Sequence, residues 1–140
     1  MPYRITWEDR GLYSKFWGVV DAGQIRRMMD VIGADERVDD LHYVISDYLD
    51  VTELSLTTQQ IDEIVAIDIA QSYSNAHYYS IAIARDEAIL RRLEYWVSVH
   101  MNPERVVFFD SLERARAWID AQPLLMTLRW PLSPAGKFWK

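Results

Sequence analysis

The segment that most constrains the fold of this chain is RVVFFDSLERARAWI, residues 105–119. Its first five residues are rich in β-branched and aromatic side chains, which favour a strand. An acidic cap position follows directly, where Asp110 and Glu113 have the spacing of a capping box. The apolar residues then recur at helical spacing, at Leu112, Ala115, Trp118 and Ile119. We therefore expect a strand over 105–109 that runs straight into a helix packed on its own sheet.

The same strand-to-helix unit recurs along the chain and predicts an α/β fold. The strands are expected over residues 3–7, 12–20, 41–46, 78–84 and 105–109. Helices are expected after Asp21, which forms a capping-box pair with Gln24, after Thr57 or Thr58, after Asp86 and after Asp110. The first two strands should form a hairpin, and right-handed crossovers should make the last strands parallel. This order, ββαβαβαβα, predicts a five-stranded mixed sheet with four helices.

Two details of the sheet follow from hydrophobicity. The segment YYSIAIA, residues 78–84, is apolar at almost every position, so we expect it in the middle of the sheet with helices on both faces. The segment after Ser46 contains several acidic residues and is expected to be a polar loop.

Size and charge narrow the class of protein. A chain of 140 residues is the size of one domain, and we expect that domain to cover residues 1–121. The formal net charge of −6 disfavours nucleic acid as a partner, because such binding depends on Lys and Arg that neutralise phosphates. The lack of cysteine excludes disulfides and thiol chemistry. The first residues carry no apolar signal segment, and we expect the protein in the cytoplasm.

Three features together resemble a known family: Gly18 before the first helix, the strand YYSIAIA, and the segment VVFFDSLERARAWI. Over roughly residues 3–119 the chain resembles the SpoIIAA-like family, which is related to the STAS domain. The resemblance implies a STAS-like sandwich. Relatives include anti-sigma-factor antagonists, which bind a partner kinase, and CRAL-TRIO lipid carriers, to which the fold has been likened. The resemblance therefore implies a protein that binds and does not catalyse.

The resemblance also implies a place for a regulatory serine. The antagonists carry it in an Asp-Ser-Ser-Gly motif where the third strand enters the second helix, but this chain has SDYLDVTELSLTTQQ there. The motif is absent, so the switch serine does not carry over. Ser55, Thr57 and Thr58 stay as a candidate anion or phosphorylation site at the helix N-terminus. Because nearby carboxylates would repel a phosphate, the favoured interpretation is that these hydroxyls cap the helix and form turns.

An enzymatic interpretation rests on Asp47 and Asp50, which follow the third predicted strand where ligands often bind in open α/β sheets. Two carboxylates there could hold a divalent cation. A receiver-type phosphotransfer site would also need a lysine directly after the last strand, where this chain has Asp110 and Ser111. The three histidines share no metal-ligand spacing, so we expect no cofactor and no metal. We interpret the two acids as solvated loop residues.

The aromatic residues are the candidate binding residues. Six tryptophans and eight tyrosines are more than a small core needs, and partly exposed aromatics mark binding surfaces. Beyond residue 121, the tail over 122–140 is rich in Leu, Trp and Phe and should dock on its own domain or on a partner subunit. Pro131 and Pro134 prevent a continuous amphipathic helix, so we do not expect membrane contact. The candidate binding residues are Tyr78, Tyr95, Trp96, Trp118 and Trp130.

The sequence therefore predicts a non-catalytic binding or regulatory module that contacts a protein partner or forms a homodimer. The alternative is a carrier of a small apolar ligand or lipid, held between helices and sheet near Trp96 and Trp118. A metal-assisted enzyme that uses Asp47 and Asp50 is the third hypothesis. A partner-binding protein should show an exposed aromatic patch, whereas a carrier should show an apolar pocket of several hundred cubic ångströms.

Overall fold

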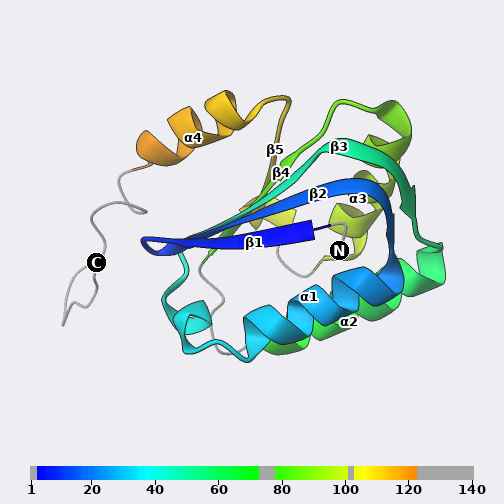
Figure 1. Cartoon of the computed structure of the whole chain (residues 1–140), viewed down its shortest axis with the longest axis horizontal. Coiled ribbons are helices and arrows are strands. Elements are labelled where there is room, and N and C mark those ends of the chain that lie inside the picture. Colours follow the sequence, from blue (N-terminus) through cyan, green and yellow to red (C-terminus); the bar gives the residue numbers. More distant parts are fainter. Residues whose placement is uncertain (1–2, 73–77, 101–102, 123–140) are drawn as a thin grey trace.

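A five-stranded mixed sheet with four α-helices forms the part of the chain that the computed structural model describes, residues 3–72, 78–100 and 103–122 (Figure 1). The sheet has the order β1-β2-β3-β4-β5; β1 is antiparallel to β2, and the other neighbours are parallel. The strands are β1 (Tyr3–Glu8), β2 (Gly11–Asp21), β3 (Tyr43–Ser55), β4 (Tyr79–Ile83) and β5 (Val106–Phe109). The helices are α1 (Ala22–Gly33), α2 (Thr58–Ser72), α3 (Glu87–Val99) and α4 (Leu112–Asp120), with 3-10 turns at Glu36–Asp40 and Pro103–Arg105. The predicted fold class and element order are confirmed.

The helices cover the two faces of the sheet unequally (Figure 1). Helices α1, α2 and α3 lie on one face, where their apolar residues form the larger core with Phe16, Val20 and Tyr48 of the sheet. Of the described helices, only α4 covers the other face, through Ala115 and Ile119. As predicted, β4 is buried from both sides, because its alternate residues join the two different cores.

The helix start signals were mostly predicted correctly. The Asp21 carboxylate accepts the Gln24 backbone N–H at 2.9 Å, and the Gln24 side chain accepts the Asp21 N–H at 2.9 Å. This reciprocal pair is the predicted capping box. At α4 the prediction was wrong, because Ser111, not Asp110, is the cap and accepts the Arg114 N–H at 3.2 Å. Ser111 directly precedes the first helical residue and so reaches that N–H.

Strand β3 differs most from the prediction. It does not end at Ser46 but continues to Ser55, and it is β3, not β4, that lies in the middle of the sheet. Its second half pairs with β2 and sends Tyr48, Val51 and Leu54 into the core with α1–α3. Asp50, Thr52 and Glu53 in this half are exposed. A strand that is exposed to solvent on one face has polar residues between its apolar ones, so its sequence resembles that of a polar loop.

The pairing of β2 with β3 is irregular at two points, at each of which β3 has one more residue than β2, and Gly18 lies at the second of them. The pairing with β3 shifts between Lys15 and Trp17 and again between Gly18 and Val19. Gly18 has φ +68°, a conformation that strains residues with a Cβ atom. Phe16 and Val20, on either side of the irregularity, both reach the same core.

Candidate ligand-binding site

A cavity of about 150 Å³ lies between the sheet and the helices α1, α2 and α3. Its wall is mostly apolar, because each of these helices turns its buried face toward the sheet at this point. The apolar wall includes Met28, Met29, Ile32, Leu93, Trp96 and Phe108. A cavity of this size is large enough for a molecule such as benzene.

A small polar group forms one part of the wall, where three elements converge. Asp68 comes from α2, Tyr78 directly precedes β4, and His100 directly follows α3. The Tyr78 hydroxyl donates to Asp68 Oδ1 at 3.2 Å, and His100 Nε2 lies 3.1 Å from Asp68 Oδ2. The Asp68 and His100 side chains are only 18% and 13% exposed, so this carboxylate is held among buried partners. The wall also includes Ser46, Gln71 and Ser80, so the cavity combines a mostly apolar body with a few polar groups, as small-molecule sites do.

The cavity wall contains an acidic residue and no lysine or arginine among the described residues. Among the described residues that line it, Asp68 is the only carboxylate. Burial and the neighbouring Asp68 raise the pKa of the Tyr78 hydroxyl. Burial, together with the charge of Asp68, raises the pKa of Tyr48, another wall residue, to about 12. Both phenols therefore stay neutral at physiological pH and leave Asp68 as the source of negative charge.

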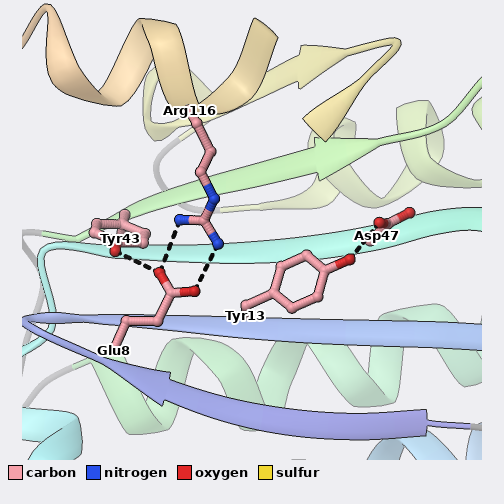
Figure 2. Close-up of polar contacts among 5 residues, drawn as sticks. All are labelled: Glu8, Tyr13, Tyr43, Asp47 and Arg116. Atoms are coloured by element: carbon pink, nitrogen blue, oxygen red, sulfur yellow. Dashed lines mark hydrogen bonds and ion pairs between the residues drawn. The ribbon is translucent and has the colours of Figure 1, made fainter. Parts of the chain in front are cut away.

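A second polar cluster lies on the opposite face of the sheet (Figure 2). Arg116 of α4 reaches across to β1 and donates to both Glu8 oxygens, at 2.9 and 2.6 Å. Tyr43 of β3 donates to the same carboxylate at 2.6 Å. Beside them, the Tyr13 hydroxyl donates to Asp47 at 2.5 Å. This cluster joins the last helix to the first three strands and has the geometry of a structural clamp.

The clamp shifts the acidity of its members. The Arg116 hydrogen bonds hold the pKa of Glu8 below its usual range, against the effect of burial. Burial and the bond to Glu8 raise the pKa of Tyr43 to about 12. Burial and the hydrogen bond to Asp47 also raise the pKa of Tyr13.

Changing Glu8 to glutamine tests this clamp. We expect a loss of about 1–2 kcal/mol in the free energy of unfolding at pH 7, because a charge-assisted bidentate pair is replaced by a weaker neutral contact. The pKa of Glu8 is lowered in the folded protein, so its contribution is complete above the usual value of 4.5 and disappears as the pH falls through the lowered pKa. Urea unfolding of both proteins at pH 7 and pH 3 measures this. The matched control is Glu53→Gln, at an exposed position of β3, and an equal loss in both variants would contradict the clamp.

The two acids of the enzymatic hypothesis lie within the strand β3 and not in a loop, although Asp50 is exposed to solvent as predicted. Asp47 is only 3% exposed and accepts hydrogen bonds from Tyr13 and from the Leu49 backbone N–H. Lys15 lies 3.8 Å from Asp47 and 2.9 Å from Asp50. Both carboxylates thus interact with side chains of the neighbouring strand β2. In the described ranges no three His, Cys, Asp or Glu side chains are grouped as a metal site would require.

The aromatic candidates lie in different places. Tyr78 and Trp96 line the cavity, whereas Tyr95 lies beside it on α3 and donates to Asp62 at 2.8 Å. Trp118 packs on the opposite face, with its ring 5.2 Å from that of Tyr79, so of the two tryptophans expected near a pocket between helices and sheet only Trp96 lines one. The sheet separates the two tryptophans because α3 and α4 cover opposite faces. Trp130 and the tail from residue 123 lie outside the described residues.

The candidate hydroxyls lie at the start of α2. Ser55 ends β3, and Thr57 and Thr58 are exposed. The Thr57 hydroxyl accepts the Gln60 backbone N–H at 3.1 Å, and the Gln60 side chain accepts the Thr57 N–H at 2.9 Å. Thr57 is thus engaged as a helix cap, as the favoured interpretation expects. An anion or phosphate at these residues stays a prediction.

Sequence reasoning missed Asp68 as a site residue. A signal for it is present, because Asp68 interrupts the apolar run IVAIDIA in the second half of α2. An acidic residue within a buried stretch needs partners. The partners, Tyr78 and His100, are separated from it by 10 and 32 positions, and only the fold shows that they meet.

Comparison with solved structures shows which known proteins have a similar fold. The anti-sigma factor antagonist SpoIIAA in its unphosphorylated form matches with a TM-score of 0.61 and 9% identity, over 86% of this chain and 99% of that one. The Bacillus cell fate determinant SpoIIAA in its phosphorylated form matches with a TM-score of 0.57 and 9% identity, over 84% of this chain and 98% of that one. An uncharacterised protein from Shewanella loihica PV-4, of the DUF3478 family with a SpoIIAA-like fold, matches with a TM-score of 0.49 and 13% identity, over 83% of this chain and 90% of that one.

No family model and no curated protein matches the sequence. The likeness to SpoIIAA therefore rests on structure, and it shows that this chain has the SpoIIAA-like, STAS-like fold that the sequence predicted. None of the described helices is both long and apolar enough to cross a membrane.

Proposed function

We propose that this protein is a non-catalytic binding module that holds a small, mostly apolar ligand in the cavity between the sheet and α1–α3. The observation that carries the proposal is the cavity of about 150 Å³ with Asp68, Tyr78 and His100 in its wall. An apolar body with few convergent polar groups is typical of small-molecule sites. The contacts of Asp47 support a non-catalytic function, because this acid is only 3% exposed and already accepts hydrogen bonds from Tyr13 and from the Leu49 backbone N–H.

The size of the cavity limits the ligand. A volume of about 150 Å³ corresponds to a molecule of roughly six to ten non-hydrogen atoms. This is smaller than the pocket of several hundred cubic ångströms that a lipid carrier would need. We therefore propose a compact ring or branched chain as the ligand, and not a long acyl chain.

Filling the cavity tests this function. Ala82 lies on β4 in the cavity wall, and Ala82→Leu adds three carbon atoms there. With benzyl alcohol as the probe, we expect the unmodified protein to bind with a Kd of about 1 mM or tighter, and the variant to bind at least about tenfold more weakly. Isothermal titration calorimetry measures both. The control is Trp17→Ala, because Trp17 is 38% exposed and is not part of the cavity wall. Equal binding to all three proteins, or no binding to the unmodified protein, would overturn the proposal.

Contact with a protein partner is the second candidate function. It is favoured by the fold that this chain shares with SpoIIAA, an anti-sigma factor antagonist. The partner in this second candidate function can also be another copy of the same chain, in a homodimer. Native mass spectrometry of the full purified chain separates the two candidates, because a retained small molecule supports the ligand-binding function and a clean dimer without one supports the partner.

A further inference from the structure

We infer that the cavity selects a small amine, a compact apolar molecule that carries one positively charged nitrogen, and that Asp68 is the residue that recognises it. This inference rests on the proposed function and adds the chemical class of the ligand. It starts from the wall of the cavity, where one carboxylate stands among apolar side chains.

The position of Asp68 supports recognition of a cation. Its oxygens accept from the Tyr78 hydroxyl at 3.2 Å and contact His100 Nε2 at 3.1 Å. Each carboxylate oxygen has two acceptor sites, so beside these contacts with described residues both oxygens have capacity for a donor from a ligand. Tyr78 and His100 hold the carboxylate in one orientation, which fixes where the ligand's nitrogen binds. An ammonium group supplies up to three donors and a charge that matches the carboxylate.

The same wall disfavours an anionic ligand. Along the described chain no lysine or arginine lines the cavity, so a carboxylate or phosphate would meet Asp68 with no permanent cation to offset the repulsion. The formal net charge of −6 also gives the protein a field that attracts cations and repels anions. A fatty acid or a phosphorylated metabolite therefore fits the site less well than an amine of the same size.

The apolar wall selects the rest of the ligand. Trp96 and Phe108 present aromatic surface, while Met28 and Met29 adapt to the shape of a ring. An aromatic amine with one or two carbon atoms between ring and nitrogen would fill the apolar part and reach Asp68. The class that fits is an arylalkylamine of about ten non-hydrogen atoms or fewer.

Three matched probes test the inference: benzylamine, benzyl alcohol and benzoate share one ring and differ in charge. At pH 7.5 we expect the unmodified protein to bind benzylamine about tenfold or more tightly than benzoate, with benzyl alcohol between them. Isothermal titration calorimetry gives the three Kd values. Benzoate binding as tightly as benzylamine would overturn the inference but leave the proposed function intact. Binding of none of the three would overturn both.

The residue assignment is tested by Asp68→Asn, with Asp62→Asn as the matched control. Both residues lie on α2, but Asp62 is exposed, bonds to Tyr95 and does not line the cavity. We expect Asp68→Asn to weaken the binding of benzylamine about tenfold and that of benzyl alcohol by less than about threefold. We expect Asp62→Asn to leave both Kd values unchanged. Equal weakening of both probes in Asp68→Asn would assign the residue to structure and overturn its recognition of the charge. The ranking of the three probes on the unmodified protein tests the ligand class even if this variant does not fold.

Discussion

Replacing Phe16 with alanine is expected to lower the free energy of unfolding by about 3–5 kcal/mol. Phe16 is 1% exposed, and its ring stacks on that of Tyr48 with centroids 5.0 Å apart and an interplanar angle of 2°. Alanine removes this contact and enlarges a cavity that already exists, because Phe16 also lines it. The surrounding sheet limits collapse into the new space, so most of the lost packing is not recovered. Urea unfolding followed by tryptophan fluorescence and circular dichroism measures the change.

Trp17 provides the matched control on the next position of β2. It is also a large aromatic residue, but its side chain is 38% exposed and it belongs to neither buried cluster. We expect Trp17→Ala to cost less than about 1 kcal/mol, as substitutions outside the core usually do. A cost for Trp17→Ala equal to that for Phe16→Ala would show that the core does not lie on the side of β2 described here.

The second large effect is expected at alkaline pH, where the free energy of unfolding should fall steeply above pH 10. Burial raises the pKa of Tyr48 and of Tyr43 to about 12, and the pKa values of Tyr13 and Tyr78 are also raised. In the unfolded chain these phenols ionise near 10, while in the folded protein they keep their protons. The folded state therefore binds more protons, and stability falls as pH rises through this range. Tyr48, which is fully buried, should contribute about 2–3 kcal/mol of this loss by pH 12.

The variant Tyr48→Phe isolates this contribution. It keeps the ring that stacks on Phe16 and removes the ionisable hydroxyl. We expect its stability to decline less than that of the unmodified protein between pH 9 and pH 11.5, measured by urea unfolding at each pH. Tyr95→Phe serves as the control, since the bond of Tyr95 to Asp62 is exposed and solvent screens it. The same alkaline slope in Tyr48→Phe and in the unmodified protein would contradict the assignment.

The elements that were predicted best from the sequence are those whose structure depends on residues close together in the chain. Asp21 and Gln24 are three residues apart, and their capping box forms as predicted. The helix expected after Thr57 or Thr58 also forms, and Ile61 and Ile64, three positions apart on it, are buried. A cap or a helical repeat is fixed by neighbouring positions in the chain, so the sequence alone is enough.

The parts that could not be predicted depend on which face of the sheet is covered. The second half of β3 resembled a loop because α4 covers only one end of its face, and polar residues occupy the remainder. Trp96 and Trp118 were expected to share a pocket, but nothing in the sequence states that α3 and α4 lie on opposite faces. Asp68, Tyr78 and His100 meet only through the packing of α2, β4 and α3.

The ion pair between Glu8 and Arg116 joins residues that are 108 positions apart. A ribosome therefore makes β1 long before its partner on α4 exists, and during synthesis one side of the growing sheet has neither its helix nor its guanidinium. Closure of this pair requires that translation has passed Arg116, so it comes only after all five strands of the described sheet have been made. Release of a chain cut short before Arg116 would leave Glu8 without that partner and the strand surfaces beneath α4 uncovered, a state that cellular quality control recognises by its exposed apolar surface.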